Sequence, residues 1–166
     1  GGTFEEAQQL GQAVAAEARK VTRAIEVADA GRPPWMRSAW VQIRREDAPP
    51  VETLDDEPAR ERAGHRWDGK AEVAALGVGD VALVGEPGEV FSETSVAIKR
   101  RLWLMGHRVP MLASYANGFN VYLPPAAAFP EGGYEVNWAR RLGLREDMQH
   151  LMWEAIAPLL PRDEDT

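Results

Sequence analysis

The sequence has no cysteine and only three histidines, His65, His107 and His150. The lack of cysteine excludes a disulfide framework and any thiolate metal site, and it leaves the redox compartment undecided. The histidines are far apart, and neither the HxH nor the HExxH spacing occurs. Each histidine alone is typical of a surface or packing residue, so the sequence does not indicate a histidine-only metal site.

Long apolar runs and an excess of basic charge are also missing. The apolar runs are far shorter than the roughly 20 residues of a membrane-spanning helix, and no signal-peptide pattern opens the chain. The net charge of -7 repels phosphate backbones. We therefore expect a soluble protein with neither a membrane span nor a nucleic-acid partner. No GxSxG nucleophile motif and no phosphate-binding glycine loop occur either.

The 166 residues are 45% hydrophobic, which suits one domain or part of a larger one. Thr3 to Glu6 have the form of a capping box, in which each of the two side chains bonds the other residue's amide. Apolar side chains then recur at helical spacing: Leu10, Val14, Val21, Ile25 and Ala28. Gly31 and Pro33 supply a stop signal. These features predict a helix over residues 4–29.

The rest of the chain alternates between strand and helix patterns. Strands are predicted at 38–45, 71–76, 80–85 and 109–115, and helices at 90–105 and 144–160. The two strands around Gly79 form a plausible hairpin. Residues 44–70 are charged, rich in proline and poor in apolar side chains, which predicts a long exposed loop. The expected fold is α/β, a layered sheet with packed helices, with residues 1–166 as a single piece.

The segment from Val81 to Phe91 reads VALVGEPGEVF, a buried strand, a hard turn and the start of a helix. Glu89 is expected at the carboxyl end of the strand, where ligands bind in open α/β sheets. It also precedes a helix, whose dipole favours an ionised carboxylate, and such a carboxylate suits a cation. Two interpretations are open: Glu89 binds a metal, or it only helps to cap its own helix.

A second segment, YANGFNVYLPP, runs from Tyr115 to Pro125. A strand ends at Tyr115, Asn117 and Gly118 turn the backbone, and Tyr122 follows. A tyrosine in such a place is either a packing residue with one hydrogen bond or a ligand. It becomes a ligand only if a cation lowers its pKa from the reference value of about 10.

Taken in order, the Pro87-Gly88-Glu89 turn, Asn117, Tyr122 and the Tyr134-Glu135 pair form a pattern that resembles the catalytic domain of the neutral ceramidases and their bacterial relatives. The resemblance covers most of the chain. It implies that the chain is the C-terminal part of a ceramidase-like catalytic domain.

The resemblance also implies roles. The chain is expected to belong to a zinc-dependent hydrolase of amide bonds, with ceramide or another N-acyl lipid as one candidate substrate. Glu89 and Tyr122 fall on zinc ligands, Tyr134 on the residue that stabilises the oxyanion, and Asn117 on a substrate-binding residue. In that family two histidine ligands and a substrate-positioning serine come from an upstream part of the domain that this chain does not contain.

These missing groups predict a partner. Structural and catalytic zinc sites use three or four protein ligands, and Glu89 and Tyr122 are only two. His65 lies in the charged loop, and His107 lies beyond the far end of a helix about 22 Å long. We therefore expect a second polypeptide carrying the two histidines and the serine, either cut from one precursor or encoded apart. The start at Gly1, without methionine, fits such a cut.

Two residues depart from the family pattern. Glu86 stands where the ceramidases carry an apolar residue, and Pro124-Pro125 replaces a threonine-rich stretch. A second carboxylate near the metal would change its charge or make the pocket less suited to a lipid. Hydrolysis of a small polar amide or an ester, and a non-catalytic scaffold subunit, therefore remain alternative functions. The sequence indicates neither compartment nor oligomeric state.

Overall fold

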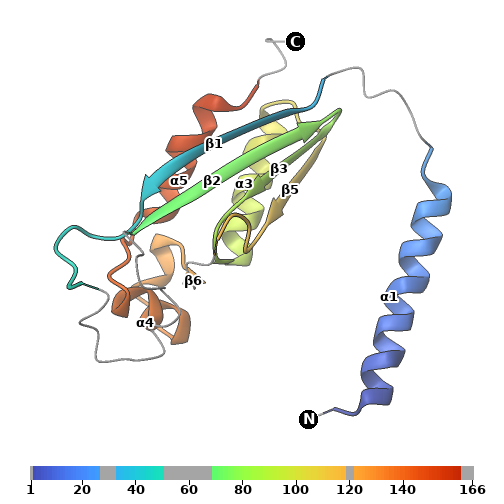
Figure 1. Cartoon of the computed structure of the whole chain (residues 1–166), viewed down its shortest axis with the longest axis horizontal. Coiled ribbons are helices and arrows are strands. Elements are labelled where there is room, and N and C mark those ends of the chain that lie inside the picture. Colours follow the sequence, from blue (N-terminus) through green and yellow to red (C-terminus); the bar gives the residue numbers. More distant parts are fainter. Residues whose placement is uncertain (1, 27–32, 51–68, 119–121, 162–166) are drawn as a thin grey trace.

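A computed structural model describes residues 2–26, 33–50, 69–118 and 122–161 (Figure 1). The elements follow one another in the order α1 (Phe4–Ala24), β1 (Trp35–Gln42), β2 (Lys70–Val78), β3 (Val81–Gly85), β4 (Glu89–Val90), α3 (Ser92–Leu104), β5 (Val109–Ala113), β6 (Tyr122–Leu123), η2 (Ala126–Ala128), α4 (Tyr134–Arg141), α5 (Met148–Ile156) and η3 (Ala157–Leu159). The predicted α/β class is confirmed.

Four of the strands form one sheet in the order β1-β2-β3-β5. The β1–β2 and β2–β3 pairs are antiparallel, and the predicted hairpin around Gly79, which has a φ of 56°, is present. β5 returns parallel to β3 after the crossover helix α3, so both strands end at the same edge of the sheet. β4 and β6 form a separate two-stranded parallel ribbon.

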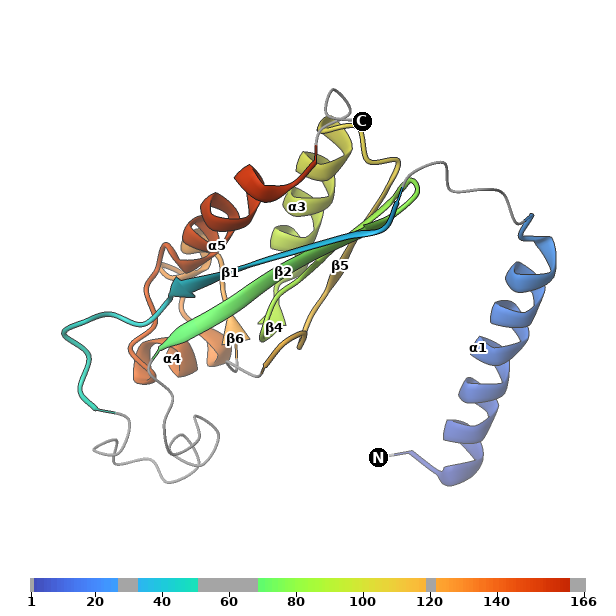
Figure 2. The ribbon, with the colours of Figure 1, turned by 45° about the horizontal axis from the view of Figure 1, so that its top comes forward.

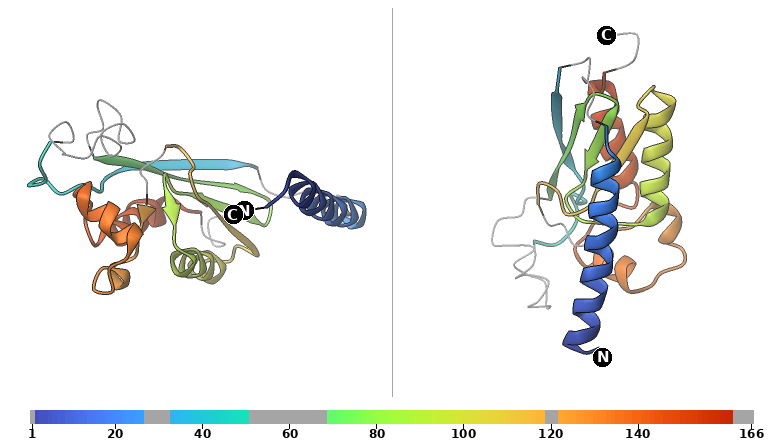
Figure 3. Two further views of the ribbon diagram at one scale, coloured as in Figure 1. Left: turned by 90° about the horizontal axis from the view of Figure 1, so that it is seen from below. Right: turned by 90° about the vertical axis from the view of Figure 1, so that its right-hand side faces the viewer.

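One face of the four-stranded sheet is covered by helices and the other is open. α5 packs on β1 and β2, and α3 packs on β5, on the same side of the sheet (Figure 3, left). Alternate residues of β2, such as Val73 and Ala75, are buried there. The opposite face carries exposed apolar side chains, including Met36, Trp40 and Met111. Side chains alternate between the two faces of a strand, so this difference follows the sequence pattern.

Helix α1 stands beside the rest of the fold (Figures 1 and 2). The capping box is present: the Glu6 amide donates to Thr3 Oγ1 at 3.1 Å, and the Thr3 amide donates to Glu6 Oε2 at 2.7 Å. No residue of α1 is buried, although the helix has an apolar stripe. It ends at Ala24 rather than at residue 29, and 27–29 lie outside the described part. None of the described helices is long and apolar enough to cross a membrane.

Two elements near the C-terminus differ from the prediction. α4 lies in a stretch for which no helix was predicted, and it begins after Gly133, whose φ is 105°. The last helix starts at Met148 instead of residue 144. Leu144 forms an isolated antiparallel bridge with Arg44, so its backbone is extended there and is not available to a helix.

The connection between β1 and β2 has a narrow neck. The amides of Ile43 and Arg44 both donate to the carbonyl of Gly69, at 2.9 and 3.2 Å. The φ of Gly69 is 81°, and a Cβ there would lie 2.3 Å from the Arg44 Cβ, so the neck requires glycine. Of the predicted exposed loop 44–70, residues 51–68 lie outside the described part. Within the described end, 45–47 are exposed and Arg44 is half-buried.

Candidate functional site

The candidate site is built on the β4–β6 ribbon, which places Glu89 beside Tyr122. The two residues are partners in the parallel register, and partners in a ladder point their side chains to the same face. Glu89 lies in the strand and not in the helix that follows. α3 begins at Ser92, and no side chain caps it. The alternative role of Glu89, as a cap of its own helix, is therefore wrong.

Tyr115 reaches Glu89 from the far end of β5. Its hydroxyl donates a hydrogen bond to Glu89 Oε2, and this bond raises the pKa of Tyr115 to about 12. The backbone of Tyr115 has a φ of 57°, which is uncommon for a bulky residue and typical of turns and functional sites. The sequence prediction treated Tyr115 only as the end of a strand and missed this contact.

Tyr134 completes the cluster from the first position of α4. Its ring meets that of Tyr122 edge to face, with centroids 5.6 Å apart and an interplanar angle of 75°. Burial, followed by a hydrogen bond with Tyr134, raises the pKa of Tyr122 above its ordinary value. Tyr134 itself is 58% exposed, so solvent or a bound molecule can reach it. The structure thus brings Glu89, Tyr122 and Tyr134 together.

Backbone hydrogen bonds tie the two predicted motif segments to each other. The Tyr115 amide donates to the carbonyl of Gly88, and the Ala116 amide to that of Glu86, both at 3.0 Å. Asn117, with a φ of 62°, forms the turn that follows. Asn117 lines a small hollow of about 80 Å³ on the open face of the sheet, and Glu89, Tyr122 and Tyr134 are not among the residues that line this hollow.

Glu86 lies behind the site and does not line it. The side chain is 1% exposed, and burial raises its pKa to about 7. Gln149 Nε2 donates to Glu86 Oε2 at 2.9 Å and to the carbonyl of Leu123 at 3.2 Å. Gln149 was not among the predicted site residues, because its helix offers no local sign that this side chain faces a carboxylate.

Neither of the two histidines in the described part of the chain, His107 and His150, joins this cluster. His107 is buried against Trp35, with ring centroids 5.9 Å apart, just before the start of β5. His150 is exposed, 4.0 Å from Glu154, and His65 lies outside the described residues. Within the described part of the chain, no group of three or more His, Asp or Glu is placed to hold a metal. The donors that the cluster itself offers are one carboxylate and three phenols.

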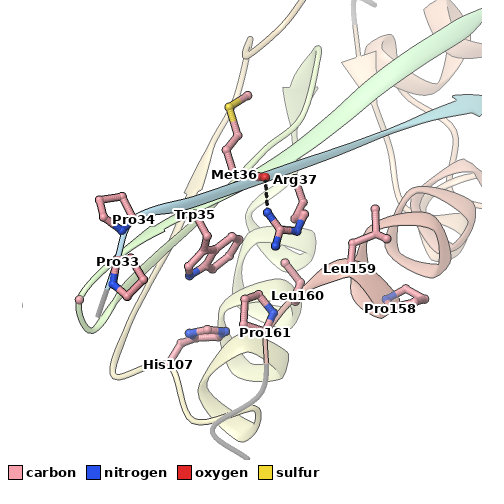
Figure 4. A pocket seen from close by; sticks show the side chains of 11 residues that line it. Pro33, Pro34, Trp35, Met36, Arg37, His107, Pro158, Leu159, Leu160 and Pro161 are labelled. Carbon is pink, nitrogen blue, oxygen red and sulfur yellow. Dashed lines mark hydrogen bonds between the residues drawn. The ribbon is translucent and has the colours of Figure 1, made fainter. Parts of the chain in front are cut away.

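A larger cavity of about 580 Å³ lies at the opposite end of the sheet (Figure 4). Trp35, His107 and several prolines line it, and the Arg37 guanidinium at its rim donates to the carbonyl of Met36 at 2.8 Å. β3 and β5 begin at this end, whereas Glu89 follows the end of β3. The cavity therefore contains none of the predicted site residues.

The fold is similar to part of the crystal structure of the neutral ceramidase from Pseudomonas aeruginosa. The TM-score is 0.51 at 16% sequence identity, over 80% of this chain and 30% of that one. A solved ceramidase complexed with C2 matches 57% of this chain and 16% of its own, with 20% identity and a TM-score of 0.46. The chain thus spans a third or less of the structures it matches. No protein-family model and no curated protein sequence matches it.

Proposed function

We propose that this chain supplies part of the active site of a zinc-dependent hydrolase of carbon–nitrogen amide bonds. Glu89 and Tyr122 are two of the metal ligands, and Tyr134 is a catalytic donor. The observation that carries the proposal is the pairing of Glu89 with Tyr122, with Tyr134 against the second of them. The likeness of the fold to a neutral ceramidase supports the same assignment.

The donor set fits zinc, because carboxylate oxygens are among its usual ligands. A bound zinc ion would supply an activated water by lowering its pKa toward about 7. Tyr115, which donates to Glu89, fixes the orientation of this carboxylate as an outer hydrogen-bond partner of a ligand does. Burial and the hydrogen bond with Tyr134 raise the pKa of Tyr122 and so keep its phenol protonated. Metal binding at Tyr122 would therefore release this proton.

Tyr134 is suited to the carbonyl oxygen of the substrate. It is exposed, it lies against Tyr122, and its hydroxyl is a donor as long as it stays protonated. Negative charge grows on the carbonyl oxygen as an amide is attacked. A donor aimed at such an oxygen contributes about 3–4 kcal/mol in other enzymes.

Two ligands are too few for a zinc site, so the proposal includes a partner. A second polypeptide, or an upstream segment, would supply two histidines and a substrate-positioning serine. The open apolar face of the sheet supports this, because exposed apolar patches of this kind mark interaction sites. The strands Val81–Gly85 and Val109–Ala113 would be covered there by the partner.

The substrate class is an amide, with an N-acyl lipid such as ceramide as one candidate and a small polar amide or an ester as the others. A polar substrate was favoured by the expectation that Glu86 stands near the metal. Glu86 is instead buried and bonded to Gln149. That reason for preferring a polar substrate therefore no longer applies.

The test uses native material purified together with whatever polypeptide accompanies the chain. Zinc content is measured by mass spectrometry, and hydrolysis is measured on N-acyl lipids and on small amides. We expect Tyr134→Phe to keep its zinc and to lose about 10²–10³ in turnover. Glu89→Gln and Tyr122→Phe should lose zinc as well as activity.

Tyr115→Phe is the matched control, since it removes a phenol from the same cluster without removing a proposed ligand. It should retain more zinc than Tyr122→Phe. A Tyr134→Phe variant of unchanged rate would refute the oxyanion role. A lone folded monomer of 18.3 kDa that binds zinc and cleaves an amide would refute the partner.

A further inference from the structure

Glu86 is a buried carboxyl in a place that does not need one for packing. It follows β3 directly, it is 1% exposed, and desolvation raises its pKa to about 7. Burying a carboxyl costs free energy unless its hydrogen bonds repay the loss of water. An apolar side chain of similar volume would avoid that cost. The hydrogen-bond contacts of Glu86 therefore indicate its role.

Those contacts run through Gln149, near the start of α5. A single nitrogen, Nε2, donates both to Glu86 Oε2 at 2.9 Å and to the carbonyl of Leu123 at 3.2 Å. A carbonyl oxygen can only accept, so the Leu123 contact fixes which end of the amide is the nitrogen. The Glu86 carboxyl is therefore the second acceptor of this nitrogen. Gln149 thus links the end of β3 to β6.

β6 is in particular need of such a link. It contains two residues, Tyr122 and Leu123, and among the described residues it pairs with β4 alone, which also has two residues. Two-stranded ribbons are marginal even when they are longer. The backbone of Glu86, in contrast, is firmly held, because its amide donates to the carbonyl of Ala113 at 3.0 Å in the extension of the main sheet.

We propose that Glu86 and Gln149 are positioning residues, which fasten the strand that carries Tyr122 to the main sheet and so hold Tyr122 beside Glu89. The role of Tyr122 as a zinc ligand rests on the proposed function, whereas the link from Glu86 through Gln149 to the strand of Tyr122 does not. The proposal assigns neither residue a contact with a substrate or a metal. Outer-shell hydrogen bonds of this kind set the orientation of ligands and change metal affinity by about 10–100-fold.

The test follows Tyr122 directly in the full chain. The protein has three tyrosines, so labelling with 3-fluorotyrosine gives three ¹⁹F resonances, which Tyr115→Phe and Tyr122→Phe assign. Glu86→Leu and Gln149→Leu remove the link and should shift or broaden the Tyr122 resonance. Glu86→Gln keeps an oxygen that accepts from Gln149 and should restore the wild-type resonance. Met152→Leu, a buried and nearly volume-conserving change in the same helix, is the matched control.

An unmoved Tyr122 resonance in Glu86→Leu and Gln149→Leu, or an equal movement in Met152→Leu, would overturn the proposal. If Gln149→Leu does not fold, Glu86→Leu decides alone, because it removes a buried carboxyl and its desolvation cost. In the assembled protein, the link-breaking variants should also lower zinc affinity by about 10–100-fold. If the wild-type assembly binds no zinc, the proposed function is contradicted, but the ¹⁹F result still tests the positioning role of Glu86 and Gln149. If the Tyr122 resonance does not move in the variants, the positioning role is wrong even where zinc binds.

Discussion

The two faces of the sheet are made by the same strands and have opposite surroundings. On the helix-covered face, Val73 and Ala75 of β2 are buried on the side where α5 packs on this strand, while on the open face Leu76 of the same strand is 38% exposed and Trp40 of β1 is 66% exposed. One helical layer buries only one face of a strand, because side chains alternate between the two faces. Strands that are apolar on both faces are typical of sheets covered on both sides. The chain therefore completes one core by itself and presents the beginning of a second.

The sharpest way to break this comparison is to shorten one leucine on each side. Leu102 of α3 is fully buried, and Leu102→Ala should lower the free energy of unfolding by about 2–5 kcal/mol through lost burial and the cavity left behind. Leu76→Ala on the open face should cost less than about 1 kcal/mol in the isolated chain. Urea denaturation of both variants measures the difference. Equal costs would mean that the open face is already covered in solution.

A second test concerns Glu86, the buried carboxyl on the helix-covered side of the sheet. The pKa of Glu86 is raised from 4.5 to about 7, so the folded chain keeps a proton that the unfolded chain releases between these values. The free energy of unfolding should therefore fall by about 3 kcal/mol from this residue as the pH rises through that window. No penalty applies below pH 4.5, and the penalty is complete above the folded pKa of about 7.

Glu86→Gln removes this ionisation. The free energy of unfolding of this variant should therefore lack the fall of about 3 kcal/mol between pH 4.5 and about 7. Chemical denaturation at several pH values from about 4 to 8 measures both proteins. Exposed carboxylates titrate alike in the two, so they cancel in the difference. A difference between the two proteins that stays constant with pH would show that Glu86 is ionised throughout, and that its surroundings are more polar than its burial suggests.

The smallest effect on stability is expected on the open face. Trp40→Gln should change the free energy of unfolding of the isolated chain by no more than about 0.5 kcal/mol, because the ring is mostly in solvent. It should, however, weaken association with the proposed partner, since large aromatic side chains dominate interface energies. Light scattering of the native assembly separates the two results. A large loss of stability in the isolated chain would contradict the exposure of Trp40 on the open face of the sheet.

The local parts of this fold could be predicted from the sequence, and the contacts between distant parts could not. The capping box at Thr3 and the hairpin at Gly79 depend on neighbours in the chain, and both are present. α4 was missed because its apolar residues are few and follow a glycine pair. The start of α5 was misplaced because Leu144 pairs with Arg44, which is distant in sequence, and no local pattern reveals such a pairing.

The candidate site divides in the same way. Glu89, Tyr122 and Tyr134 were singled out through the order of their motifs, and the structure brings them together. Their roles remain predictions. The contact of Tyr115 with Glu89 depends on a left-handed backbone at Tyr115, which is unfavourable for that residue type and so is not expected from propensity. Gln149 acts across 63 positions of the sequence and gives no local signal.

The neck at Gly69 separates the sheet from the connection that it closes. β1 and β2 are held by their own register from Trp35 opposite Gly77 to Gln42 opposite Lys70, and the neck is sealed just beyond it. A change in the length of the connection then alters mainly its closure entropy, by about 0.6 kcal/mol for each doubling. The register of β1 and β2 therefore does not depend on the length of the connection beyond the neck.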